Sequence, residues 1–509
     1  MQGYAPGQEA AFTQSRECYQ DLENWMASED AAGLQHGELE EQLDARGREL
    51  LRRLFQDRLD LTAAREERRH DVAGEDGVPR TRAEKGRTRP LVTRFGQVTV
   101  SRIAYRSPGR ANVHLLDREL NLPEEKHSHG LRKLTAIEAV RGSHEDAAAA
   151  ITRATGMKIG KRQAEELVLR AARDVDGFCE DRRPAPAPDE HALVLTFDGK
   201  GIVMRPDALR PATAKAAAAA RNKLATRLSP GEKNGRKRMA ELACVYDAVP
   251  VPRTPGDVIS TPAQKRRKKK AQDRKGKRRE PQAKGKWLTA SVTDDIPAVI
   301  AAAFEEAQRR DPEHRRKWIA LVDGNNPQID AVTAEAASRG VNVTIIIDLI
   351  HVLEYLWQAA WSFFGKGEPA AESWVADQAL KILHGKAAQV AAGIRRRATT
   401  FGYTSAEREG ADACAGYLTA KKEHLDYAAA LAKGWPIATG VIEGACRHLV
   451  KDRMDITGAR WGLGGAEAIL KLRALISNGD FQPYWRYHLR REHERIHGAR
   501  YRESLTLAA

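Results

Sequence analysis

The stretch HALVLTFDGKGIVM, residues 191–204, decides the fold that we expect for this chain. Its run from Leu193 to Phe197 is short and apolar, which is typical of a buried strand. The run ends on a carboxylate, Asp198, and Gly199 follows directly. We expect a turn at this glycine and a second strand that returns through residues 202–204. A carboxylate next to a buried apolar run is costly unless a partner stabilises it, so Asp198 is a candidate site residue.

The same pattern occurs again in WIALVDG, residues 318–324, where an apolar run ends on Asp323 and Gly324 follows. A single strand-end Asp-Gly is most often a turn. Two of them on neighbouring strands favour a shared metal site instead. Further strands are expected at 241–249, 286–292 and 341–348, and helices at 298–310 and 327–340. Antiparallel strands followed by strand-helix-strand crossovers predict an α+β or α/β chain whose mixed sheet, flanked by helices, has the RNase H-like order.

A third acid is needed to close such a site, and Glu443 is the candidate. It lies early in the helix expected within GWPIATGVIEGACRHLVKDRM, residues 434–454, between Gly440 and Gly444. These glycines would let the helix approach the sheet or a nucleic-acid backbone closely. An ordinary glutamate near a helix N-terminus, paired with Arg447, is the alternative reading. Phosphate contacts and a stacking surface are expected from Arg447, Lys451, Arg453, Arg460 and Trp461.

Four blocks, TFDGKGIVM, LVDGN, IIIDLIHVLEYLW and GVIEGACRHLVKDRMDITGARWG, resemble the catalytic domain of bacterial insertion-sequence transposases of the ISKra type. The resemblance covers about residues 191–480, and VTRFGQVTVSRIAYR is similar to the N-terminal block of that family. It implies that Asp198, Asp323 and Glu443 form a DDE triad. Asp348 and His351 match a D-x-x-H element, and the residues before Glu443, about 365–435, match an all-helical insertion.

The resemblance implies a DNA transposase that cleaves transposon ends and joins them to target DNA, acting on double-stranded DNA as a homo-oligomer. Two Mg²⁺ ions suit this chemistry, and Mn²⁺ is expected to substitute. Asp198 is expected to bridge the ions, while Asp323 and Glu443 each complete one. Asp348 is expected to orient the site and His351 to contact phosphate, although a helix cap and a core histidine are equally open readings. The alternatives are an RNase H-like nuclease without strand transfer and a domesticated nucleic-acid-binding relative.

The segments before the catalytic region are expected to be mainly helical, with one β-hairpin. Residues 1–90 form a charged arm suited to oligomerisation, in which Leu39, Leu43, Leu50 and Leu54 share a helical face. Residues 91–185 hold the hairpin, turned at 95–97, and a DNA-binding module. A helix-turn-helix at 143–173 would place Lys158, Lys161 and Arg162 before its recognition helix, while an ordinary helical hairpin is the alternative. The catalytic domain is expected at 190–485, with a basic tail at 486–509.

The chain of 509 residues carries a net charge of +15, which favours polyanionic partners. Much of this charge lies between residues 261 and 286, where 13 Lys and Arg face two acids. This run belongs to a basic, disordered insertion expected at about 207–286. Phosphate contacts are expected from Lys265, Arg266, Arg267, Lys268, Lys269 and Lys270, and a solubilising linker is the alternative reading. Five scattered cysteines form no zinc motif. With neither a membrane span nor a signal peptide in the pattern, we expect a cytoplasmic, nucleoid-associated bacterial protein.

Overall fold

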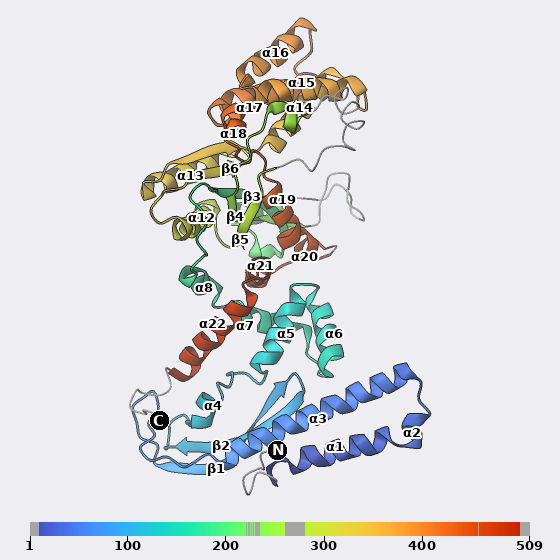
Figure 1. Ribbon diagram of the computed structural model, residues 1–509, viewed down its shortest axis with the longest axis vertical. Helices are drawn as coiled ribbons and strands as arrows, with labels where there is room; N and C mark the ends of the chain where they lie inside the picture. The colour runs from blue at the N-terminus through green and yellow to red at the C-terminus, as the bar shows by residue number, and fades with distance from the viewer. Residues whose placement is uncertain are drawn as a thin grey trace. The chain divides into compact units, whose positions relative to one another are not determined.

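The structure is a computed structural model that describes residues 10–219, 235–259, 280–456 and 458–498, with a few isolated positions between 221 and 229. The chain divides into two compact units (Figure 1). Unit 1 comprises residues 1–180 and 480–509, and unit 2 comprises residues 181–479. Unit 2 is therefore inserted between two parts of unit 1.

The core of unit 2 is a five-stranded mixed sheet. Its strands lie in the order β5-β4-β3-β6-β7. They are β3 (Ala192–Met204), β4 (Arg236–Ala248), β5 (Ala283–Ser291), β6 (Trp318–Val322) and β7 (Val343–Ile347). β3, β4 and β5 are antiparallel neighbours, whereas β3, β6 and β7 run parallel. Every residue of β6 is buried, as its continuous apolar run predicts for a central parallel strand.

β3 corrects the prediction of a turn at Gly199. It continues as one strand through both Gly199 and Gly201, and it pairs with β4 from Ala192 to Met204. The two glycines are accommodated because long side chains on β4, those of Met239 and Lys237, lie over them. The strand expected at 241–249 is confirmed as β4, which begins earlier, at Arg236, so the prediction of a disordered insertion over 207–286 is wrong for residues 236–248. Short helices α9 (Pro211–Ala219) and α10 (Pro255–Val258) flank that strand in sequence.

Helices cover the sheet and extend beyond it. α12 (Ile296–Arg310) packs on β3, β4 and β5, and α13 (Asn326–Arg339) connects β6 to β7. Residues 349–432 contain no strand, as expected for a helical insertion. Its helices are α14 (Leu349–Phe363), α15 (Pro369–Leu383), α16 (Ala387–Thr400), α17 (Glu409–Ala420) and α18 (Tyr427–Ala432). The chain then returns to the sheet through α19 (Gly440–Cys446), a π-helical segment (Arg447–Lys451), α20 (Asp452–Met454) and α21 (Leu463–Ser477).

Unit 1 is built on a β-hairpin and its helices. Two helices, α1 (Thr13–Met26) and α3 (His36–Ala64), run side by side, and α3 packs on the hairpin (Figure 1). The hairpin strands are β1 (Arg82–Thr93) and β2 (Gly96–Arg106), so the predicted hairpin is confirmed but begins earlier in the chain. The remaining helices are α2 (Glu29–Ala32), α4 (Leu115–Glu119), α5 (His129–Ala139), α6 (His144–Thr155), α7 (Lys161–Ala171) and α8 (Val175–Asp181).

The C-terminal segment differs from the basic tail predicted at 486–509. α22 (Phe481–His493) and a π-helical segment (Glu494–Gly498) are helical and belong to unit 1. Tyr484 and His488 of α22 are fully buried, and the Tyr484 hydroxyl donates to the main-chain oxygen of Ala171 at 2.5 Å. Buried side chains at this spacing anchor a helix, so this part of the chain is structural. Among the described residues, no helix is long and apolar enough to cross a bilayer.

Candidate active site

Asp198 and Asp323 lie on neighbouring parallel strands. Thr196 of β3 is opposite Leu321 of β6, so continuing this register by two residues places Asp198 level with Asp323. Adjacent strands in a sheet are about 4.7–4.9 Å apart. Both carboxylates are partly exposed, which leaves them open to a ligand from solvent. The two strand-end acids singled out from the sequence are therefore brought together by the sheet.

Glu241 is a third carboxylate near this pair, and sequence reasoning missed it. It lies on β4 opposite Gly199, and its Oε2 is 3.3 Å from where a Cβ on that glycine would be. Burial is the main cause that raises the pKa of Glu241, and the charges of Asp198 and Asp323 raise it further. The charge of Arg210 opposes this rise, so both the two acids and a cation act on Glu241 at this end of the sheet. Glu241 lies on β4, the neighbour of the strand that carries Asp198-Gly199, and no Asp-Gly pair of its own marks it in the sequence.

α19 lies directly against Asp198. The buried thiol of Cys446, at the end of α19, donates a hydrogen bond to Asp198 Oδ2 at 3.0 Å. The other oxygen, Oδ1, accepts from the main-chain nitrogen of Gly199 at 2.7 Å. Burial raises the pKa of Cys446 above the ordinary thiol value, and the nearby charges of Asp198 and Glu443 add to the rise. Glu443 lies one turn before Cys446, and its side chain is exposed.

Asp348 links α14 to α19 and is almost fully buried. As the N-cap of α14 it accepts from the main-chain nitrogen of Ile350 at 3.0 Å. It also accepts from the main-chain nitrogen of Thr439 at 3.1 Å and from that residue's hydroxyl. Thr439 is the N-cap of α19 and its main-chain oxygen accepts from the nitrogen of Glu443 at 3.1 Å. Asp348 therefore fixes the start of the helix that carries Glu443.

His351 completes this group. Its Nδ1 is 3.1 Å from Asp348 Oδ2, and the ring is partly exposed. The hydrogen bond to Asp348 is the main cause that raises the pKa of His351, and the charges of Asp348 and Asp323 add to it. Burial alone would raise the pKa of Asp348, but hydrogen bonds from His351, Thr439 and Ile350 outweigh it and lower the pKa. The helix-cap reading of Asp348 is confirmed, and it coexists with a position beside the acids.

The backbone around Asp323 is held by a tyrosine. The hydroxyl of Tyr417 on α17 donates to the main-chain oxygen of Asp323 at 2.9 Å. Its ring stacks on Tyr355 of α14 with centroids 4.0 Å apart. Gly324 has a φ of +91°, and a Cβ there would lie 2.5 Å from the Tyr417 hydroxyl. Asp323 Oδ1 accepts from the main-chain nitrogen of Asn325 at 2.7 Å, which orients the carboxylate.

The oxygen donors fit hard divalent cations such as Mg²⁺. Among the described residues, Asp198, Asp323 and Glu443 do not bring three ligand atoms within 4.8 Å of one another. Their separation is therefore too wide for one compact cage.

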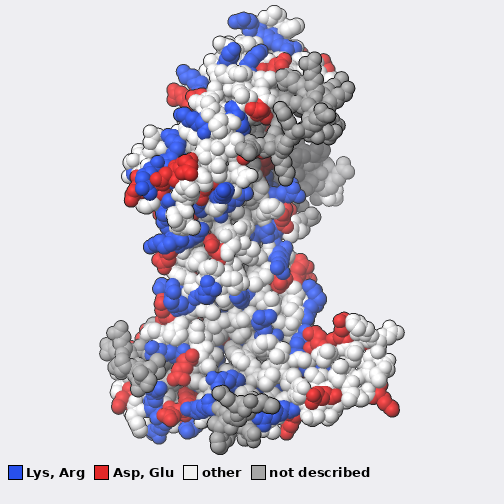
Figure 2. Space-filling model, in the orientation of Figure 1, with Lys and Arg blue, Asp and Glu red and all other residues white. Residues whose placement is uncertain are grey.

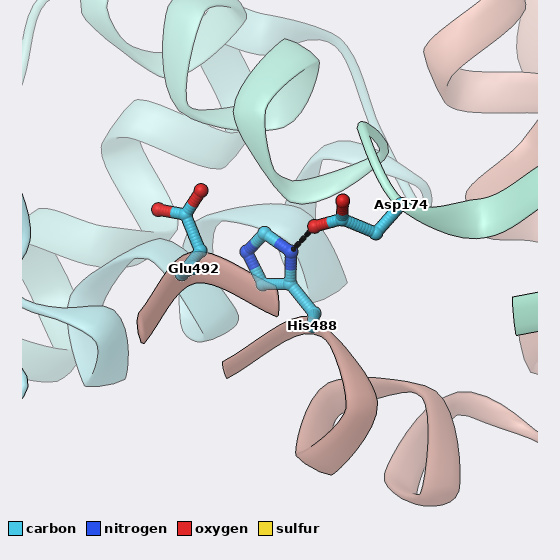
Figure 3. Close-up of side chains that lie close together, drawn as sticks. All are labelled: Asp174, His488 and Glu492. Carbon is cyan, nitrogen blue, oxygen red and sulfur yellow. Dashed lines mark hydrogen bonds and ion pairs between the residues drawn. The ribbon is translucent and has the colours of Figure 1, made fainter. Parts of the chain in front are cut away.

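Within the described ranges, three such groups do come together at Asp174, His488 and Glu492 in unit 1 (Figure 3). His488 Nδ1 is 2.7 Å from Asp174 Oδ2. Arg132 is fully buried and lies 2.8 Å from Glu492, and Arg495 pairs with both carboxylates. Two guanidinium groups thus already supply the positive charge that a cation would bring. We interpret the cluster as the ion-pair network that fastens α22 to unit 1.

The basic residues predicted after Glu443 separate into two groups. Arg447, Lys451 and Arg460 are exposed. Arg447 and Lys451 bound the π-helical segment, a local widening of the helix that is frequent at functional sites. Arg453 and Trp461 contradict the prediction, because both are buried and the guanidinium of Arg453 lies 4.7 Å from the Trp461 ring centroid. They pack against each other and offer no stacking surface to a ligand.

α6 and α7 form the predicted helix-turn-helix segment as two helices joined by a turn, which fits both the DNA-binding reading and an ordinary helical hairpin. Ile151 and Ala164 join these helices in a small core, while Lys158, Lys161 and Arg162 are exposed at the start of α7. Figure 2 shows Lys and Arg side chains interspersed with Asp and Glu over the visible face of the molecule. The basic run Lys265–Lys270 lies outside the described residues. No protein-family model matches this chain, and no curated protein matches its sequence.

Proposed function

We propose that this chain is a DNA transposase of the DDE type, with an RNase H-like catalytic domain in unit 2. The sheet supports the proposal through its order, in which three antiparallel strands are followed by two parallel additions on the side of β3. The observation that carries it is the placement of Asp198 level with Asp323, with α19 packed against Asp198. A strand-end pair and a helix-borne glutamate are what a two-metal phosphoryl transfer site needs.

Asp198, Asp323 and Glu443 would hold two Mg²⁺ ions at this end of the sheet. Bound magnesium supplies activation of the attacking oxygen and stabilisation of the leaving oxygen. The chain's own residues then have positional tasks. Asp348 and Thr439 fix the start of α19, so the backbone that carries Glu443 is held in place. Nδ1 of His351 is hydrogen-bonded to Asp348, so Nε2 is the ring nitrogen that would contact a phosphate oxygen.

Exposed cations near α19 would receive the DNA backbone. Arg447 and Lys451 follow Glu443 by one and two turns, and Arg460 follows on the loop before α21. The side chain of Arg447 is 74% exposed, and its contact with Asp452 is long, at 3.9 Å. Weakly paired, exposed cations of this kind position the phosphates but carry no base specificity.

The test measures cleavage of DNA that carries the transposon ends, in the presence of Mg²⁺. The variants are Asp198→Asn, Asp323→Asn and Glu443→Gln. Each substitution keeps the shape of the side chain and removes its charge. We expect cleavage to fall by at least about 10³-fold, since metal-dependent phosphoryl transfer loses its ligand, while DNA binding stays near wild type. Asp330→Asn is the matched control, because this aspartate is exposed on α13.

Normal cleavage by the Asp198 or Asp323 variant would overturn the proposal. A second assay uses pre-cut ends with a free 3′-hydroxyl and a target duplex. Joined products support a transposase, whereas cleavage without joining indicates a nuclease. DNA binding with neither activity, at any concentration of Mg²⁺ or Mn²⁺, indicates a protein that only binds nucleic acid.

A further inference from the structure

A cavity at the open end of the unit 1 hairpin has four arginines among its eleven lining residues. It has a volume of about 820 Å³ and lies where β1 begins and β2 ends. The charged residues that line it are Arg68, Arg82, Glu84, Arg106 and Arg110. Four guanidinium groups thus face one carboxylate, and all five residues belong to unit 1.

The register of the hairpin places two of these charges directly opposite each other. Arg82 pairs with Arg106 across β1 and β2, so their side chains leave the same face of the sheet. The next pair, Ala83 and Tyr105, points to the other face, where Tyr105 is buried in a small core. Like charges directly opposite in an antiparallel pair destabilise it. An anion between them would remove that repulsion.

The charges that lie nearby do not neutralise the cavity. Glu84 is shared, since it pairs with Arg106 at 2.8 Å and with Arg87 at 2.9 Å. Arg110 makes only a long contact of 3.7 Å with Asp76. Within the part of the chain that the structure describes, the side chains of Arg68 and Arg82 form no hydrogen bond or ion pair. Both side chains are exposed and remain available to a ligand.

The rest of the rim is small or polar. Thr81, Ala83, Ser107, Pro108, Gly109 and Asn112 complete the lining of the cavity. Gly109 has a φ of +69°, and a Cβ there would meet nothing within 4 Å. The loop therefore leaves room for a bulky anion at the guanidinium groups. Arginine presents a planar fork of donors that matches phosphate oxygens in pairs.

We infer that this arginine cavity binds the phosphodiester backbone of duplex DNA and anchors it on the hairpin. A cavity of about 820 Å³ that is lined by four guanidinium groups has room for more than one phosphate, so it suits a polyanion better than one small anion. The contact is to backbone, so it adds affinity and fixes register without reading sequence. The inference rests on the proposed function only in taking transposon or target DNA as the natural ligand. It involves no catalytic step.

The experiment measures the affinity of the full chain for duplex DNA by fluorescence anisotropy, without divalent metal, at several salt concentrations. The test variant is Arg68→Ala/Arg82→Ala. Each lost phosphate contact lowers the slope of log K against log salt by about 0.9, so we expect a slope smaller by about 2. At 0.1 M salt this corresponds to binding weaker by roughly tens of fold.

The matched control is Arg58→Ala/Arg486→Ala, which removes the same charge from exposed positions on α3 and α22 of unit 1. We expect this control to keep the slope within about 0.5 of wild type. A conservative variant, Arg68→Lys/Arg82→Lys, should keep the slope but weaken binding, because a point charge replaces the fork. Circular dichroism and thermal melting establish that all three variants are folded.

Equal changes in the test and control variants would overturn the inference, and so would an unchanged slope in the test variant. A second measurement tests whether inorganic phosphate at millimolar concentration stabilises the wild type and the test variant against unfolding. If it stabilises the wild type but not the test variant, while DNA binding is equal in both, the cavity is a small-anion site and the inference is wrong. Loss of cleavage in the Asp198 variant is read separately, so the two proposals fail independently.

Discussion

Gly324 is the position where the backbone beside the acids tolerates least change. Its φ of +91° suits glycine, and a Cβ would clash with the Tyr417 hydroxyl that holds Asp323. We expect Gly324→Ala to lower the free energy of unfolding by roughly 2–4 kcal/mol. Urea denaturation followed by circular dichroism measures this.

The control for this glycine is Gly340→Ala at the end of α13. That glycine also has a positive φ, of +62°, but a Cβ there would meet nothing within 4 Å. Only the conformational cost of roughly 1–2 kcal/mol should remain. Partial recovery in a Gly324→Ala/Tyr417→Phe variant would assign the difference to the hydroxyl, and equal effects at both glycines would contradict the clash.

Asp348 is expected to act through α19. In Asp348→Asn one acceptor oxygen becomes a donor that faces the donors of Thr439 or His351. We expect a loss of roughly 1–3 kcal/mol in stability and a higher Mg²⁺ requirement for cleavage. A magnesium titration of cleavage rate, compared with melting temperature, separates the two effects. Thr439→Val should shift both in the same direction, and a variant that melts earlier without a changed magnesium requirement would remove the positioning role.

At the scale of single residues, the sequence marked acids that follow apolar runs but not the groups that contact them. Asp198 and Asp323 could be predicted because each ends a strand with a glycine behind it. Cys446 and Thr439 could not, because their partners lie 248 and 91 residues away in the chain. Trp461 was misread for a related reason. An aromatic beside arginines predicts a stacking surface, whereas only tertiary packing decides that it is buried.

At the scale of elements, the attachment of α22 to the rest of unit 1 depends on buried charged side chains. Asp174 and Glu492 are buried, which alone would raise the pKa of each carboxyl. Pairing with His488 and Arg495 at Asp174, and with Arg132 at Glu492, outweighs burial and lowers both pKa values. Their stabilising contribution is complete above the ordinary values of 3.8 and 4.5 and is lost as the pH falls through the lower, folded values.

We therefore expect acid to loosen α22 from unit 1. Melting temperature measured against pH should fall below about pH 4, and Glu492→Gln should show a smaller fall than wild type. Arg132→Ala leaves Glu125 and Glu492 without their buried cation, at a cost of roughly 3–5 kcal/mol. An exposed control, Arg141→Ala, should change stability by less than about 0.5 kcal/mol. A pH profile unchanged by Glu492→Gln would show that the network does not hold the helix.

Most elements could be predicted from periodicity, but their ends and partners could not. The hairpin, the α6–α7 pair and the strands ending at Asp323 and Asp348 were expected where they occur. The turn expected at Gly199 is absent because β4 pairs with β3 along its whole length. Local sequence cannot show that a strand more than 30 residues away, β4, will pair with β3 through Gly199 and Gly201. The same limit made α22 look like a tail, since its burial depends on α7 and α8.

For the whole molecule, two compact units with separate cores predict more than one unfolding step. Differential scanning calorimetry of the full chain should resolve two transitions. Gly324→Ala should lower the transition of unit 2, and Arg132→Ala should lower that of unit 1, each with little effect on the other. A single transition that both variants shift equally would mean that the units unfold together.

The return of α22 to unit 1 also constrains biosynthesis. A ribosome must finish all of unit 2 before it can deliver the last helix of the first-made unit. Until then the early residues lack Tyr484 and His488, which fill their interior. A prematurely terminated product would therefore be an incomplete fold rather than a free-standing competitor for the same DNA, and we expect it to be degraded.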